Sequence, residues 1–214
     1  VGFYGLVGAG RTEVMEAVFG LTPTTSGSIR IGGAAVSIGS PMQAIRQGLA
    51  YVPEDRGRNG GILPMSIGAN ISLAALGRLG RGPFLSTSRE AELAHRFTQL
   101  LSIKAANAAQ RLDQLSGGNQ QKVVISKWLA TDPGIIILDE PTKGIDIGSK
   151  IAVHEFIGEL VGRGVAVVLV SSELDEVLGL SDRIVVMHRG RVAARLDRAA
   201  ASRELIVRHA SGDS

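Results

Sequence analysis

Two adjacent carboxylates, Asp139 and Glu140, directly follow a short apolar run, Ile135–Leu138, that begins after Pro133-Gly134. Such a run is typical of a strand buried on both faces of a parallel sheet, although a purely structural strand has the same pattern. Carboxylates at the C-terminal end of a parallel strand lie where α/β proteins bind their ligands. We therefore expect Asp139 to hold Mg²⁺ through water, and Glu140 to orient or deprotonate an attacking water.

A second candidate lies upstream, where Leu115-Ser116-Gly117-Gly118 precedes a helical run, Val123–Ala130. Two glycines before a helix allow backbone N–H groups to point at an anion, and the helix N-terminus adds positive potential. This segment is therefore predicted to contact phosphate.

The segment Gly5–Thr12, GLVGAGRT, matches the phosphate-loop pattern except that Arg11 stands where Lys is usual. A predicted strand leads into it, and a predicted helix follows at once, as the motif requires. The helix N–H groups would cradle phosphates, and the Thr12 hydroxyl would bind Mg²⁺. A Gly-rich turn is also a common packing device, but the downstream motifs favour phosphate binding. The cofactor-binding residues predicted here are Gly5, Gly8, Ala9, Gly10, Arg11, Thr12 and Glu13.

Together these segments resemble the nucleotide-binding domain of ATP-binding cassette (ABC) proteins. LSGGNQQ at 115–121 is similar to the ABC signature, IIILDE at 135–140 to the Walker B motif, and GID at 144–146 to the loop that follows it. The resemblance implies an ATPase with ATP and Mg²⁺ as cofactors. It also implies head-to-tail pairing, in which the signature of one cassette faces the phosphate loop of another. Residues added to the nucleotide site on this basis are Ser116, Gly117, Gly118 and Gln120.

Three positions depart from the ABC pattern, and in the family all three face the γ-phosphate. Arg11 replaces a compact Lys by a wide planar fork. Glu54 stands where the family has a Gln that touches Mg²⁺ and water; a carboxylate would bind Mg²⁺ but repel the γ-phosphate unless shielded, and a solvated acidic turn is an equal alternative. Ser172 replaces a His and cannot be cationic, and with Ser171 it would also suit a helix cap. The resemblance implies catalytic roles for Glu140, Glu54 and Ser172, and metal binding by Thr12, Asp139 and Glu54.

Four segments, GLVGAGRTE, YVPEDR, LSGGNQQK and VSSELDEVLGLSDRI, together resemble the C-terminal ATP-binding half of bacterial simple-sugar importers of the ribose, galactose and xylose type. This resemblance implies a peripheral protein at the cytoplasmic face of the inner membrane that energises sugar import. The implied partners are a second cassette in the N-terminal half of the same polypeptide, transmembrane permease subunits and, indirectly, a periplasmic sugar-binding protein. Sugar identity would be determined in those other chains.

Because the deviations gather at the γ-phosphate while the signature is intact, we expect an asymmetric pair. This cassette would bind nucleotide in a weak site of its own and donate its signature to a competent partner site, with little hydrolysis by the isolated chain. One alternative is a complete ATPase with unusual residues. Another is a soluble ABC ATPase that acts as a regulatory or translation factor.

The elements that must position these residues follow the α/β pattern of an ABC-type P-loop NTPase. We expect a mostly parallel sheet flanked by helices, a helical subdomain and a truncated antiparallel β part, with the nucleotide-binding core at 1–61 and 132–214 and the helical subdomain at 62–131. Residues 56–61 are predicted to form a mobile polar loop. The predicted strands are 1–7, 26–33, 49–52, 135–138, 165–170, 183–188 and 192–196, and the predicted helices are 12–19, 41–48, 70–76, 87–101, 120–130, 147–162 and 202–209.

Bulk composition fits a compact α/β domain: 214 residues, 44% hydrophobic, with a formal net charge of +3. Lys and Arg are scattered, so no nucleic-acid partner is expected. There is no cysteine and hence no disulfide framework, and no apolar run reaches transmembrane length. Since the first residues already have a strand pattern, we expect the chain to begin inside a longer protein. The aromatic residue that stacks on adenine in the family would then precede Val1.

Overall fold

The computed structural model describes residues 1–81 and 84–212, with the backbone alone at Arg56, Arg58 and Arg81. Its contacts form two compact units. Unit 1 comprises residues 1–51, 134–140 and 163–214, and unit 2 comprises residues 52–133 and 141–162. Within the described ranges, no helix has the length and apolarity needed to cross a membrane.

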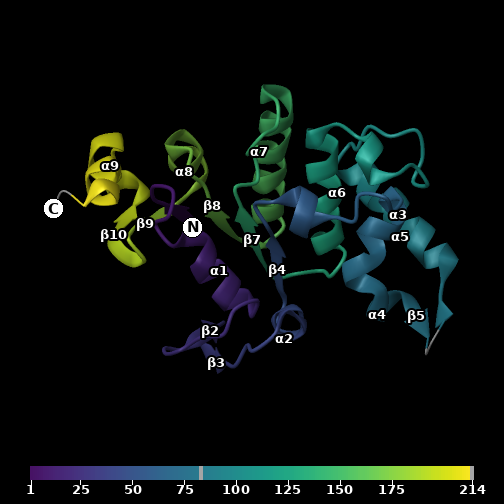
Figure 1. Cartoon of the computed structure of the whole chain (residues 1–214), viewed down its shortest axis with the longest axis horizontal. Helices are drawn as coiled ribbons and strands as arrows, with labels where there is room; N and C mark the ends of the chain where they lie inside the picture. Colours follow the sequence, from purple (N-terminus) through teal and green to yellow (C-terminus); the bar gives the residue numbers. More distant parts are fainter. Residues whose placement is uncertain (82–83, 213–214) are drawn as a thin grey trace. The chain divides into compact units, whose positions relative to one another are not determined.

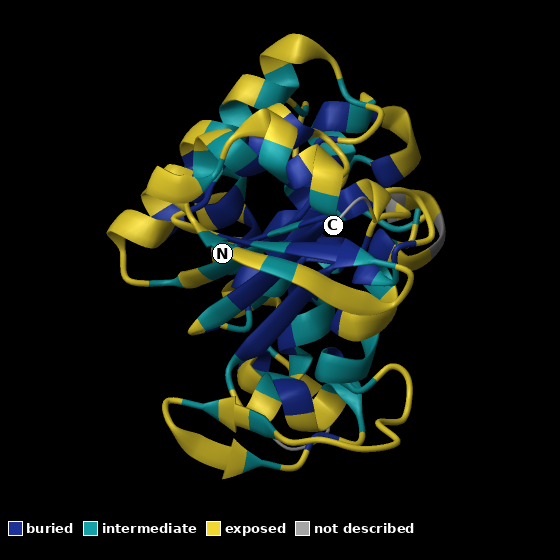
Figure 2. Cartoon of the chain, turned by 90° about the vertical axis from the view of Figure 1, so that its left-hand side faces the viewer, coloured by how far each residue is buried: buried dark blue, intermediate teal, exposed yellow. Residues whose placement is uncertain are grey.

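Unit 1 is built on a six-stranded sheet with the order β10-β9-β1-β8-β7-β4. Strands β9, β1, β8 and β7 run parallel, and β10 is antiparallel to β9. Figure 2 shows the strands of this sheet as largely buried, apart from edge strand β10. The sheet strands are β1 (Gly2–Tyr4), β4 (Leu49–Val52), β7 (Ile135–Asp139), β8 (Ala166–Val170), β9 (Arg183–His188) and β10 (Arg191–Asp197).

The remaining elements of unit 1 are short helices and one hairpin. Ser40 caps α2 by accepting a hydrogen bond from the backbone N–H of Gln43. The exposed antiparallel hairpin of β2 and β3 matches the truncated β part that the sequence predicts. The elements are α1 (Arg11–Phe19), β2 (Ile29–Ile31), β3 (Ala34–Val36), α2 (Pro41–Arg46), α8 (Leu174–Leu180), the 3₁₀ turn Arg198–Ala200 and α9 (Arg203–Ser211).

Strand β1, which leads into the phosphate loop, is anchored by an apolar cluster. Tyr4 of β1 packs with Val177 of α8, with Ile184 and Val186 of β9 and with Ile206 of α9, and all five residues are buried. Burial of each such side chain favours the folded state by roughly 1.5–3 kcal/mol. The cluster therefore fixes the strand end from which the loop departs.

Unit 2 is mainly helical. Figure 1 shows α3, α5 and α6 gathered together, and α3 packs on both α5 and α6. Ile67 and Ile71 of α3 and Ile125 of α6 are fully buried. The elements are a π-helical turn (Arg56–Gly60), α3 (Ile67–Ser72), a 3₁₀ turn (Leu73–Ala75), α4 (Leu76–Leu79), β5 (Gly80–Arg81), β6 (Phe84–Leu85), α5 (Thr87–Leu100), a 3₁₀ turn (Leu112–Gln114), α6 (Gly117–Leu129) and α7 (Ile147–Gly162).

The predicted fold class is confirmed: a mostly parallel central sheet, flanking helices and a small antiparallel sheet are all present. The predicted loop at 56–61 is partly wrong, because residues 56–60 form a helical turn. Two side chains hold the segment that contains this turn. Lys127 donates to the carbonyl of Gly60, and the amide of Asn70 exchanges hydrogen bonds with Ile62 of 2.7 and 3.0 Å. In the structure residues 141–162 group with unit 2, whereas the predicted functional boundary at 132 stays a prediction.

Candidate functional site

Three chain segments leave the sheet of unit 1 at one edge. In the register of the parallel strands, Asp139 of β7 lies opposite Val170 of β8, and Val170 lies opposite Phe3 of β1. The residues that follow these three positions therefore emerge at the same level. They are the Walker B carboxylates, the Ser171-Ser172 pair and the phosphate loop.

The phosphate loop rests on the turn between β9 and β10. A Cβ atom at Gly5 would lie 2.6 Å from the carbonyl oxygen of Met187, so only glycine fits there. Gly10 has a φ of 90°, and a Cβ there would lie 3.0 Å from the Cα of Gly190, whose N–H donates a 2.9 Å hydrogen bond to the Ala9 carbonyl. The phosphate loop is thereby fixed against the β9–β10 hairpin.

The N-terminus of α1 is suited to an anion. Gly10 is its N-cap residue, and no side chain supplies a capping hydrogen bond. The first N–H groups of a helix need an acceptor, and a phosphate is a suitable one. Gly8 has a φ of 80°, with open space where a side chain would stand. Thr12 is half-buried, and Glu13 is exposed in the first helical turn.

Arg11 does not extend into an open loop. It is 9% exposed, and its Nη1 lies 3.1 Å from Oε1 of Glu140, which is 7% exposed. The backbone of Glu140 has a φ of 49°, and its N–H donates a 2.8 Å hydrogen bond to the Val170 carbonyl. The cation of the phosphate loop is therefore paired with the predicted catalytic carboxylate of the same chain.

Ser172 binds the other oxygen of that carboxylate, since its hydroxyl donates a 3.1 Å hydrogen bond to Oε2 of Glu140. Ser171, fully buried, accepts a 3.0 Å hydrogen bond from the N–H of Glu173. The predicted helix cap is wrong, because the N-cap residue of α8 is Glu173 and it receives no side-chain capping hydrogen bond. Ser171 instead braces the turn before α8, and the catalytic role of Ser172 stays a prediction.

Asp139 is fully buried, and its Oδ2 accepts a 3.0 Å hydrogen bond from the hydroxyl of Tyr51 on β4. Tyr51 also packs on Phe19 of α1, with ring centroids 5.5 Å apart. Sequence reasoning missed Tyr51. Its signal was a phenol in the otherwise apolar strand 49–52, because a buried hydroxyl requires a partner.

The residues fit a nucleotide with Mg²⁺. The loop offers a glycine cradle and an uncapped helix start, and Asp139 and Thr12 carry side-chain oxygens of the kind that Mg²⁺ prefers; metal binding by them stays a prediction. Across the described ranges, no three His, Cys, Asp or Glu side chains gather as a metal site.

The other predicted site residues belong to unit 2. Glu54 forms a 2.5 Å ion pair with Lys143, and both side chains are more than a third exposed. This exposed pair fits the solvated acidic turn as well as a carboxylate shielded by one cation. The proposed metal contact of Glu54 stays a prediction.

The signature segment is formed as a helix start. Ser116 is the exposed N-cap residue of α6, and its Oγ accepts a 2.9 Å hydrogen bond from Asn119. The Gln120 amide donates to the carbonyls of Leu112 (3.3 Å) and Leu115 (3.1 Å), which ties down the preceding turn. This contact positions the segment, and nucleotide contact by Gln120 stays a prediction.

Gly118 of the signature packs on the start of α7. A Cβ there would lie 2.1 Å from Oγ of Ser149. Ser149 is itself held by Asp146, whose carboxylate accepts hydrogen bonds from its hydroxyl (2.7 Å) and its N–H (3.0 Å). The side-chain bond, followed by the backbone bond, lowers the pKa of Asp146. The signature and the loop after Walker B are thus coupled through one serine.

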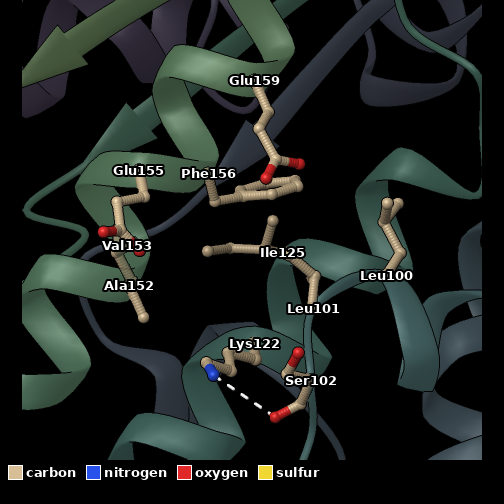
Figure 3. A pocket seen from close by; sticks show the side chains of 10 residues that line it. All are labelled: Leu100, Leu101, Ser102, Lys122, Ile125, Ala152, Val153, Glu155, Phe156 and Glu159. Carbon is tan, nitrogen blue, oxygen red and sulfur yellow. Dashed lines mark hydrogen bonds between the residues drawn. The ribbon is translucent and has the colours of Figure 1, made fainter.

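A separate hollow lies inside unit 2, at the end of α5 and beside α6 and α7 (Figure 3). Its cavity is about 120 Å³, which is small against the 300–1,000 Å³ typical of ligand pockets. Lys122 donates a 3.4 Å hydrogen bond to the Ser102 carbonyl at its rim, and burial, with nearby Lys104, lowers the pKa of Lys122. We do not assign the nucleotide to this hollow.

Comparison with known proteins agrees with these features. The model of the family described as "ABC transporter" matches residues 1–143. The ribose import ATP-binding protein RbsA of Jannaschia sp. (strain CCS1) is 57% identical over 99% of this chain and 41% of its own length. The RbsA proteins of Roseobacter denitrificans and Geobacillus kaustophilus are 53% and 47% identical. Each match covers 99% of this chain, with 42% and 43% of the relative's length. The chain therefore spans about two fifths of the length of these curated relatives.

Solved structures confirm the fold. The ATP-binding cassette MJ0796, a dimer in a post-hydrolysis state bound to ADP and Pi, matches with a TM-score of 0.78 at 22% identity, over 92% of this chain and 84% of that one. The cassette MJ1267 matches with a TM-score of 0.82 at 19% identity, over 98% and 87%. The resemblance to the ATP-binding part of simple-sugar importers, predicted from the motifs, is confirmed by the named relatives.

Proposed function

The chain belongs to the ABC transporter family, and on that basis we propose that it is an ATP-binding and ATP-hydrolysing domain that energises import of a simple sugar across a bacterial inner membrane. The names of the relatives, ribose import ATP-binding proteins, support a sugar as cargo. Their greater length leaves room for a second cassette, and we propose that this chain is the C-terminal of the two. We propose residues 1–61 and 132–214 as its nucleotide-binding core and 62–131 as its helical subdomain.

Within such a pair, this cassette has a degenerate phosphate site and donates its signature to its partner. The observation that carries this proposal is the buried pairing of Arg11 with Glu140, which engages both the loop cation and the general base. The exposed Ser116 at the start of α6 supports signature donation, because a second cassette would have access to it.

The chemistry is in-line transfer of a phosphoryl group to water. Gly8, Gly10 and the N-terminus of α1 bind the phosphates; Thr12 and Asp139 would hold Mg²⁺, which would supply positive charge to neutralise the phosphates. Tyr51 orients Asp139 by its hydrogen bond. Glu140 positions water and accepts its proton once it leaves Arg11, and Ser172 holds the other oxygen of that carboxylate.

The partners we propose are a second cassette, transmembrane permease subunits and, indirectly, a periplasmic sugar-binding protein. The placement is peripheral, at the cytoplasmic face of the membrane. The MJ0796 cassette was solved as a dimer, which supports pairing. A soluble regulatory or translation factor is not favoured by the named relatives. Co-purification with ribosomes in place of permease subunits would contradict the transport assignment.

The deciding experiment measures ATP turnover by the chain alone and by the two-cassette complex. We expect slow turnover alone and faster turnover in the complex. Replacing Ser116 by Arg should abolish the stimulation without preventing nucleotide binding to this chain, since Ser116 faces the partner's site. Fast turnover by the isolated chain, lost on Glu140→Gln, would show that its own site is complete.

A further inference from the structure

Two side chains from distant parts of unit 1, Arg11 and Ser172, both contact the carboxylate of Glu140. Arg11 follows β1, Glu140 follows β7 and Ser172 follows β8, and the two contacts on Glu140 are 3.1 Å each, one on each oxygen. Arg11 and Ser172 are also two of the three positions at which the chain departs from the ABC pattern. The departures are therefore physically linked, since both bind the same carboxylate.

The pairing has consequences for phosphate binding. Arg11 and Glu140 are both buried, so their attraction is weakly screened by solvent. If the two side chains separate, little water is available to hydrate either charge. A phosphate held by the glycine loop requires the same guanidinium, because Arg11 stands at the cation position of the motif. The backbone N–H bond of Glu140 to Val170 keeps the carboxylate near Arg11.

We infer that Glu140 occupies on Arg11 the place that a nucleotide phosphate takes, and that Ser172 is a positioning residue that holds Glu140 there. Phosphate and Glu140 then compete for one guanidinium. The inference rests on the proposed nucleotide site, and it identifies the element that weakens that site. In this inference Ser172 holds the carboxylate of Glu140 and does not itself contact phosphate.

The test is ADP binding to the full chain by calorimetry, in EDTA to exclude metal and turnover. Glu140→Gln removes the competing charge and leaves Arg11 uncompensated, so ADP should bind about tenfold more tightly or better. Ser172→Ala removes one hydrogen bond from the carboxylate, and about fivefold tighter binding is expected. Glu16→Gln, which removes one negative charge elsewhere on α1, is the matched control and should change binding less than about twofold.

Competition predicts a coupling that general destabilisation does not. In an Arg11→Met background, adding Glu140→Gln should tighten ADP binding much less than it does beside Arg11, because the shared cation is gone and only direct repulsion of the phosphates is relieved. Adenosine, which carries no phosphate, should bind wild type and Glu140→Gln equally. Circular dichroism establishes that each variant is folded, and if Glu140→Gln fails to fold, Ser172→Ala decides the outcome.

Two results would overturn the inference in distinguishable ways. If ADP binds wild type, Glu140→Gln and Ser172→Ala with equal affinity, the competition is absent while the nucleotide site stands. If no variant binds ADP or ATP at all, the proposed nucleotide site fails as well.

Discussion

Lys127 on the signature helix is a buried cation whose charge should reduce stability at neutral pH. It is 7% exposed, its ammonium donates to the Gly60 carbonyl and lies 4.9 Å from the ring centroid of Trp128. Burial lowers the pKa of Lys127 from 10.5 to about 8. Since the unfolded chain keeps the ordinary pKa, folding releases a proton between these two values.

This proton release determines how the free energy of unfolding changes with pH. Below a pH of about 8, both states carry the proton, and the full cost of burying the charge opposes folding. As the pH rises from about 8 to 10.5, the unfolded state binds more protons than the folded state, so the free energy of unfolding increases. The full shift corresponds to roughly 3 kcal/mol, of which about 2 kcal/mol is regained between about pH 7 and about pH 9.5.

Lys127→Met isolates this contribution. We expect the mutant to gain stability relative to wild type at about pH 7, offset in part by loss of the hydrogen bond to Gly60, and that relative gain to shrink by about 2 kcal/mol at about pH 9.5. The assay is urea unfolding followed by the fluorescence of Trp128, the only tryptophan in the sequence.

The control is Lys104→Met, which removes the same charge from an exposed position in the same unit. If the stability difference between wild type and Lys127→Met is the same at both pH values, the ammonium is not desolvated and the reasoning fails. The reasoning also fails if the stability difference between wild type and Lys104→Met changes with pH as much as the difference for Lys127→Met does.

Three further outcomes are expected. Glu140→Gln should lower the free energy of unfolding by about 3 kcal/mol, whereas the pair Arg11→Met with Glu140→Gln should lower it far less, because no buried charge is left alone; additive losses in a urea-unfolding cycle would argue against the ion pair. Tyr51→Phe keeps the ring but removes the donor to the carboxylate that ends β7, and should cost about 1 to 3 kcal/mol in thermal unfolding, against no change if that bond is absent. Gly118→Ala should lower the free energy of unfolding by about 1 to 3 kcal/mol, and adding Ser149→Gly should restore most of that loss. Urea denaturation of the double mutant tests this, and no recovery would exclude the close contact.

The sequence predicted the elements well because their signals are local. Ile147–Gly162, Leu49–Val52 and Arg183–His188 have the predicted boundaries. Apolar periodicity and glycine stops act within a few residues, so they can be read without the tertiary structure. The two-residue strands β5 and β6 were missed, since each is too short to show a period.

The contacts between side chains within the site could not be predicted from the sequence. Arg11 and Glu140 are 129 positions apart, and their pairing depends on the strand order β1-β8-β7, which no local pattern specifies. The motif predicted where each backbone segment lies, but not that the loop cation would bind the carboxylate of its own chain. Tyr51 was missed for the same reason, because β4 lies next to β7 only in the folded sheet.

The contact between Gly190 and the phosphate loop limits how the protein can be engineered. The short turn at Arg189-Gly190 is far in sequence from Gly10 and is exposed, so it looks like a convenient place for a fluorescent tag or an epitope. Yet its backbone N–H supports Ala9, and its Cα leaves no room for a side chain at Gly10. A graft at that hairpin would therefore deform the loop that binds phosphate, and a reporter is better placed on the β2–β3 hairpin.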